Sequence, residues 1–401
     1  MPAAIYIFSL CTFAFGLSEF VVAGLVSTIA SDLDADIGGV GGAIAAYAFG
    51  AAIGAPFITA LVSRWQDKSI LVMSMIVLTI GNILMTLAPE IITLLAIRFL
   101  VGLGHGVFMA VASDAATKLV DPTRAGRALS VVWIGLTLAL AFGVPIGAFL
   151  GNIWSWRAIF VSIGALSVLS TLGLVFFMPS GKDENRADGR QGAWVGIKAI
   201  THAQLLITAG IGALVSVATF TFFTFISPYL LQITQVDFQW LSMAMLMFGL
   251  CSILGNLLGG YVVDATDADR GLMAALAGLA LNLLGIYLLR SSPIAIVLLA
   301  GALGVLFFSI VTMLTLRLLK LARRFIPAST AVAAGLNIAS FNLGTAVGGA
   351  LGSITIAYGL LPYIPVVGSL AAIFAVTVLW MQMRHMRRPS ADGHPQIATD
   401  G

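Results

Sequence analysis

Three side chains that can hold a charge or a proton lie inside long apolar stretches of the sequence: Glu19, Arg98 and His105. Ionisable groups in an apolar medium require a partner or a water-filled cavity. Glu19 is the one carboxylate in the middle of such a stretch, histidine titrates near neutrality, and arginine stays charged. This combination predicts proton binding and release at Glu19, sensed by Arg98 directly or through water, with His105 as a possible relay.

Each of the three residues also has a purely structural interpretation. Glu19 could be a protonated glutamate that hydrogen-bonds to a neighbouring helix. Arg98 lies only one to two turns from the expected end of its helix, so its head group could extend to the surface. His105 could be a neutral histidine packed against glycines. The sequence alone leaves these alternatives open.

The stretches that carry these residues are typical of membrane-spanning helices. Of the 401 residues, 60% are hydrophobic and 9% are charged, whereas soluble domains have about 25% charged residues. A span requires about 20 apolar residues, and unpaired backbone groups are excluded from lipid. We therefore predict twelve spanning helices, at residues 5–29, 39–62, 70–88, 91–116, 128–152, 158–178, 203–228, 239–263, 271–289, 293–316, 328–355 and 361–383.

A polar stretch divides the spans into two groups of six. We expect six-helix bundles at 1–178 and 202–384, a cytoplasmic linker at 179–201 and a polar cytoplasmic tail at 385–401. A cytoplasmic N-terminus would place on the cytoplasmic side all basic residues except Arg98, Arg157 and Arg290, in agreement with the positive-inside rule. Both termini are therefore expected in the cytoplasm of a plasma membrane protein, in a bacterium the inner membrane.

The two halves show an internal repeat. Gly143, Gly147 and Gly151 match Gly344, Gly348 and Gly352 at a constant offset. Glycines at spacing four form a flat ridge on one helix face. Pro145 lies inside the first ridge, where it removes a backbone donor and favours a kink. The ridge with Gly143, Pro145 and Gly147 indicates either ordinary close packing or a hinge and half-to-half contact.

Four segments carry a resemblance to a known family. They are Leu17–Gly24, Arg98–Gly106, Gly143–Gly147 (GVPIG) and Trp156–Phe160 (WRAIF). Together they resemble the major facilitator superfamily, and within it the twelve-helix drug/proton antiporters, which include sugar-, nucleoside- and chloramphenicol-efflux proteins. The resemblance covers essentially the whole chain. It implies an all-α membrane fold of two pseudo-symmetric six-helix bundles, with proton-coupled efflux as the activity.

One loop departs from the family pattern. Between the second and third spans the family carries an acidic residue, where this sequence has Ser63 followed by Arg64 and Lys68. The corresponding position of the second half keeps an acid, Asp264. The resemblance implies that Arg64, Lys68 and Asp264 belong to cytoplasmic gate loops, with a charge latch that is weakened or arranged differently.

Substrate contacts are expected from aromatic and amide side chains of the second half. Phe223 belongs to an aromatic run in the seventh span, and Asn337 and Asn342 flank Phe341 in the eleventh. Such groups could line a cavity for a small organic molecule. Packing between helices is the alternative for each.

Other functional classes lack their motifs. The sequence has no His-Glu-x-x-His, no Gly-x-Ser-x-Gly with credible partners and no Walker A loop, so we expect neither an enzyme nor ATP-driven transport, and no metal or cofactor. Its basic residues lie between apolar runs, which argues against nucleic-acid binding. We predict a monomeric proton antiporter that exports a drug, sugar or nucleoside. The alternatives are an uncoupled facilitator, a proton-coupled importer, or a receptor or scaffold that transports nothing.

Overall fold

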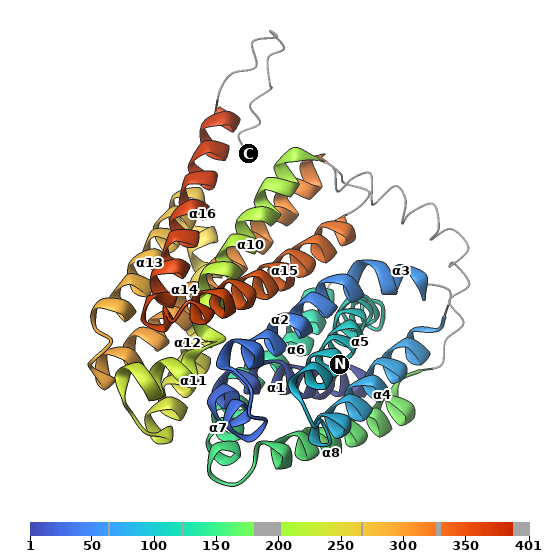
Figure 1. Ribbon diagram of the computed structural model, residues 1–401. Coiled ribbons are helices and arrows are strands. Elements are labelled where there is room, and N and C mark those ends of the chain that lie inside the picture. Colours follow the sequence, from blue (N-terminus) through green and yellow to red (C-terminus); the bar gives the residue numbers. More distant parts are fainter. Residues whose placement is uncertain (63–64, 122–123, 180–201, 266–267, 326–329, 388–401) are drawn as a thin grey trace.

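The computed structural model describes residues 1–62, 65–121, 124–179, 202–265, 268–325 and 330–387, and these residues form helices without any strand (Figure 1). The first half contains α1 (Ala3–Asp32), α2 (Ile37–Ile53), α3 (Thr59–Leu61), α4 (Asp67–Thr86), α5 (Ile91–Lys118), α6 (Ala125–Leu138), α7 (Val144–Ile153) and α8 (Trp156–Phe177). The second half contains α10 (Ala203–Phe223), α11 (Ile226–Pro228), α12 (Phe238–Ala265), α13 (Ala268–Leu288), α14 (Pro293–Phe325), α15 (Thr330–Ala357) and α16 (Ile364–Arg387).

Each of the twelve predicted spans corresponds to a helical segment of the structure. Eleven helical segments there are long and apolar enough to cross a membrane. The predicted eleventh span, at 328–355, corresponds to α15, a helix of 28 residues packed between α10 and α2. The all-α fold of twelve spanning helices in two bundles is therefore confirmed. Residues 180–201 of the expected linker at 179–201 and residues 388–401 of the expected tail at 385–401 lie outside the described residues, and α16 continues through 385–387.

Prolines accompany three wider, π-helical turns inside the spans. These turns are η1 (Gly54–Ile58), which contains Pro56, η3 (Ala139–Gly143), just before Pro145, and η5 (Tyr229–Thr234), just after Pro228. Proline cannot donate the backbone hydrogen bond of a regular turn, and π turns are one way in which a helix accommodates this. The predicted fifth span is accordingly α6, η3 and α7 in sequence.

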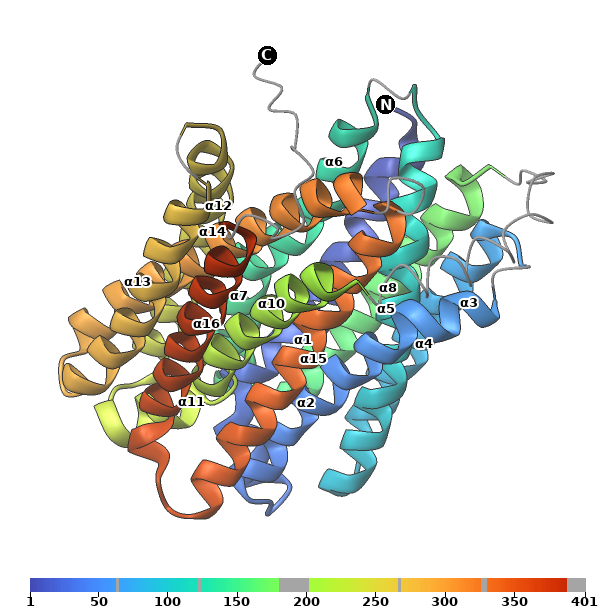
Figure 2. The ribbon, with the colours of Figure 1, turned by 90° about the horizontal axis from the view of Figure 1, so that it is seen from above.

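The helices of each half pack mainly on one another. In the first half α1 packs on α6 and α8, and α5 packs on α2 and α4; in the second half α10 packs on α15 and α16, and α12 on α14. The halves meet where α2 runs along α15 and where η3 and α7 face α12. Figure 2 shows the start of α1 and the end of α16 at one face of the molecule, here called the termini face. The α1–α2 and α15–α16 connections lie at the opposite face.

The glycine ridge of the fifth span faces its own bundle. A side chain at Gly143, Gly147 or Gly151 would meet Leu17, Val21 or Leu25 of α1, respectively. In this structure the glycines therefore pack within the first bundle, and the predicted hinge or half-to-half contact stays a prediction. Leu140 and Ala141 of the same span contact the second half instead. Their backbone lies so close to Gly249 of α12 that a Cβ atom on Gly249 would clash with it.

Candidate functional site

The structure brings Glu19 and His105 together inside the first bundle. Glu19 lies in the middle of α1 and its residue is 5% exposed. One of its carboxylate oxygens, Oε2, is 3.5 Å from Nδ1 of His105 on α5. The imidazole stacks on Phe15 of α1 with ring centroids 4.9 Å apart, and Tyr47 of α2 lies against it. Neither imidazole nitrogen makes a hydrogen bond among the described residues, and both nitrogens are buried.

Arg98 is fully buried and points into the same region. Its guanidinium donates three hydrogen bonds to backbone carbonyls: to Ser18 over 2.6 Å, to Glu19 over 3.0 Å and to Ala43 over 3.2 Å. The charge also lies over the ring of Tyr47, 4.2 Å from its centroid. The guanidinium therefore does not extend to the surface, and that alternative is wrong.

The net charge of Glu19, Arg98 and His105 together depends on whether Glu19 is protonated. The guanidinium is a permanent cation held by neutral carbonyls and an aromatic ring, and one of these carbonyls is the backbone carbonyl of Glu19. With Glu19 ionised and His105 neutral, the cluster has no net charge; with Glu19 protonated, it carries one positive charge. Charges interact strongly where water is excluded. A change in the protonation of Glu19 would therefore alter the electrostatic energy of α1, α2 and α5 together.

A side chain of α4 forms a polar contact with α1 next to this site. The hydroxyl of Ser18 donates to Oδ1 of Asn82 over 3.0 Å, and Nδ2 of Asn82 donates to the carbonyl of Leu78 over 2.7 Å. Both residues are fully buried. Ser18 thus links Asn82 to Arg98, because its own carbonyl accepts from the guanidinium. Ser18, Asn82 and Tyr47 were not predicted as site residues, and Ser18 alone lay in a segment that the resemblance singled out.

Aromatic side chains continue from Glu19 across to the second half. Phe20 stacks on Phe220 of α10 with centroids 6.0 Å apart, which joins the two bundles. Phe220 in turn contacts Phe307 of α14, and Phe223 contacts Phe248 of α12 at 4.3 Å. Phe223 is buried among these rings. The group, called here the aromatic cluster, consists of Phe20, Phe220, Phe223, Phe248, Phe307, Phe308 and Phe341.

The predicted substrate residues of α15 are only partly engaged by the protein. Phe341 lies at the edge of the aromatic cluster, against Phe307. The amide of Asn337 donates to the hydroxyl of Thr315 over 2.9 Å, and that of Asn342 donates to the carbonyl of Ile338 over 3.0 Å. All three are half-buried. Each amide retains an oxygen and a second N–H that a solute could use.

The predicted gate loops lie mostly outside the described part of the chain. Arg64 falls in the gap at 63–64, and the side chain of Asp264 is likewise outside it; Lys68 is half-buried in the first turn of α4. A charged contact that the sequence did not single out is present nearby, where Arg317 of α14 pairs with Asp269 of α13. It links two helices of the second bundle.

At the opposite face the two halves are joined. Ser227 of α11 donates to Ser27 of α1 over 3.2 Å, and Ser353 of α15 donates to the carbonyl of Gly38 in α2 over 2.8 Å. The ring of Phe225 lies between Gly41 of α2 and Gly352 of α15, where any Cβ atom would clash with it. The described structure is therefore closed at this face.

Comparison with known proteins agrees with this architecture. A sequence profile of the Major Facilitator Superfamily matches residues 8–326. The chain is 32% identical to the inner membrane transport protein YdhP of Escherichia coli K12, over 93% of this chain and 94% of the relative. It is 31% identical to a chloramphenicol resistance protein of Streptomyces lividans, over 89% and 90%. It is 26% identical to a probable sugar efflux transporter of Helicobacter pylori P12, over 94% of each chain. The chain therefore belongs to the major facilitator superfamily and is a multi-pass membrane transporter.

Proposed function

We propose that this transporter exports a small organic solute in exchange for protons. The observation that carries the proposal is the placement of the Glu19 carboxyl group beside His105, with Arg98 bound to the backbone of the same turn of α1. Export is supported by relatives named for chloramphenicol resistance and sugar efflux. The solute would belong to the drug, sugar or nucleoside class, with no enzymatic step.

Proton coupling requires that protonation and solute binding influence each other. When Glu19 takes up a proton, Arg98 becomes an uncompensated buried cation, which is unfavourable at bilayer depth. Phe20 follows Glu19 directly and stacks on Phe220 of the second half. A shift of α1 in response to the proton is thereby passed to the aromatic cluster, where we place the apolar part of the solute. His105 would relay the proton to or from Glu19.

Alternating access follows from the position of the contacts between the halves. The contacts of Ser27, Gly38 and Phe225 close the opposite face, so the central region would be reached from the termini face. The bias of basic residues supports a cytoplasmic location for the termini face. The structure then corresponds to the state that loads solute from the cell. Rocking of one bundle against the other, with a bend at η3 and Pro145, would open the opposite face.

The proposal is tested by proton release from purified protein reconstituted in liposomes. Sugars, nucleosides and amphiphilic antibiotics are added singly to the wild type and to Glu19→Gln. Glu90→Gln serves as the control, because Glu90 is an exposed glutamate just before α5. We expect at least one compound to release protons from the wild type and Glu90→Gln, and not from Glu19→Gln. Equal solute flux in all three proteins without proton movement would instead make this an uncoupled facilitator.

A further inference from the structure

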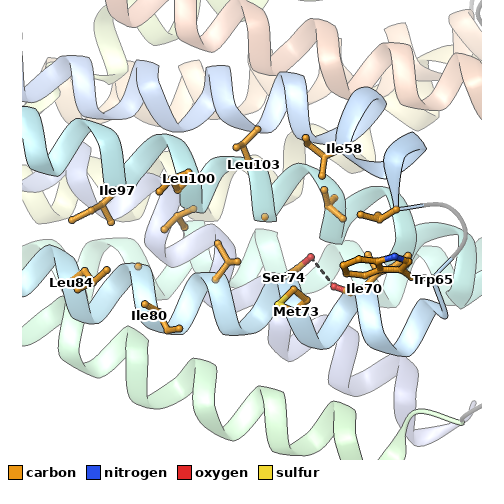
Figure 3. A pocket seen from close by; sticks show the side chains of 16 residues that line it. Ile58, Trp65, Ile70, Met73, Ser74, Ile80, Leu84, Ile97, Leu100 and Leu103 are labelled. Atoms are coloured by element: carbon orange, nitrogen blue, oxygen red, sulfur yellow. Dashed lines mark hydrogen bonds between the residues drawn. The ribbon is translucent and has the colours of Figure 1, made fainter.

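An apolar groove runs along the outside of the first bundle, away from the site described above. Its walls come from α4, α5, the end of η1 and the turn that follows α3, and its volume is about 390 Å³. Figure 3 shows side chains of α4 and α5 turned toward one another along its length. In Figure 1, α4 lies on the side of the first bundle that is remote from the second. The groove therefore opens where a membrane protein meets lipid.

The groove has the dimensions of a single acyl chain. It extends along α4 from Ile70 to Leu84, which is about 21 Å at a rise of about 1.5 Å per residue. One leaflet contributes about 15 Å of hydrocarbon, half of the bilayer core, so the groove is long enough to hold an acyl chain over the full depth of a leaflet. Leu100 is 56% exposed and Ile80 is 53% exposed, so the groove is open along its side. A flexible chain can enter it laterally from the bilayer.

The lining excludes a polar occupant. The one hydroxyl group of the lining, on Ser74, donates to the carbonyl of Ile70 over 3.0 Å, as Figure 3 shows. The remaining lining side chains are hydrocarbon, apart from the thioether of Met73 and the indole of Trp65. A sugar, a nucleoside or water would find no hydrogen-bond partner there. An alkyl chain requires none.

Only one end of the groove carries a lining side chain with a polar N–H, the indole of Trp65. Trp65 lies at one end, where Asp67 and Lys68 begin α4. Indole rings favour the level of the lipid headgroups, so this end marks the membrane surface. Leu84 and Ile97 lie at the other end of the groove, near the connection between α4 and α5, and both side chains are hydrocarbon. We propose that the groove binds one acyl chain of a membrane phospholipid, with the headgroup at the Trp65 end.

Photolabelling in lipid nanodiscs tests this proposal without any measurement of transport. The probe is phosphatidylethanolamine with a diazirine in one acyl chain, and labelled residues are mapped by mass spectrometry. Val77→Phe places a ring in the groove, whereas Ile76→Phe changes the adjacent residue, which is exposed and does not line it. We expect labels concentrated on the groove face of α4 and α5 in the wild type and Ile76→Phe, and at least fivefold fewer in Val77→Phe.

A second variant fills the groove from the other wall. Leu100→Trp on α5 is expected to reduce the labelling as Val77→Phe does, and it decides the question if Val77→Phe does not fold. Equal labelling of the groove in the wild type and the folded filling variants would overturn the proposal. So would labels spread evenly over the exposed residues of α8, because the groove would then be no more than ordinary surface.

Discussion

Arg98 donates to the backbone carbonyl of Glu19, while the carboxyl group of Glu19 lies beside His105. The guanidinium is therefore anchored to the helix that carries the proton site and not to the carboxylate. Its three acceptors, on Ser18, Glu19 and Ala43, are backbone carbonyls, which do not titrate. The contacts that anchor α1 on α5 are therefore separate from the Glu19 carboxyl group, which we propose binds the proton.

Arg98→Lys is expected to reduce solute-driven proton release by roughly tenfold or more. An ammonium group keeps the positive charge, but it lacks the planar fork that reaches carbonyls of α1 and α2 at once. The measurement is the initial rate of proton release in liposomes at saturating solute. Arg290→Lys is the matched control, because Arg290 lies at a helix end and bonds only to Tyr287 among the described contacts. An unchanged rate in Arg98→Lys would mean that charge alone suffices.

His105→Phe is expected to slow proton release by roughly tenfold and to leave solute binding intact. Phenylalanine can keep the stack on Phe15 but has no nitrogen with which to pass a proton to Glu19. Equilibrium binding and proton release are measured on the same preparation. His202→Phe is the control, because His202 is also stacked on a phenylalanine, Phe325, far along the chain from Glu19. If both variants release protons at the wild-type rate, His105 is only a packing residue.

Asn82→Ala is expected to weaken the site through α1. The hydroxyl of Ser18 loses its acceptor, and a polar contact between membrane helices contributes about 0.5–2 kcal/mol. Thermal unfolding in detergent should show this loss, and proton release per solute should fall. Asn282→Ala removes a comparable contact, to Leu299 between α13 and α14, and is expected to lower stability without changing the coupling. If both variants release the same number of protons per solute, Asn82 contributes only to helix packing.

Long apolar runs were sufficient to predict the helices. The ends of some helices were predicted wrongly, because the limits of an apolar run do not coincide with the limits of a helix. The predicted tenth span stops at 316, whereas α14 continues to Phe325, because Arg317 pairs with Asp269 of α13 and the helix extends past the apolar part. The predicted seventh span was continuous to 228, whereas α10 ends at Phe223 and a π turn follows Pro228. Hydropathy measures transfer to lipid and says little about hydrogen bonding at helix ends.

The residues of the site were predictable only in part. Glu19, Arg98 and His105 stand out because charge is rare in apolar runs, and the structure places them together. The acceptors of Arg98 are backbone carbonyls, which every residue has, so no sequence pattern could identify them. Tyr47 and Asn82 look like ordinary packing residues until the neighbouring helices are in place.

Alternating access is tested by locking the opposite face. A Cβ atom on Gly38 would lie 3.6 Å from Cα of Ser353, so cysteines at these two positions are close enough for a disulfide. Cys11 and Cys251 are first replaced by serine to leave the new pair alone. We expect oxidation of Gly38→Cys/Ser353→Cys to abolish transport and a reducing agent to restore it, because α2 and α15 must separate for solute to leave. Each single cysteine variant should be insensitive to oxidant. Full transport by the cross-linked protein would show that this face does not open.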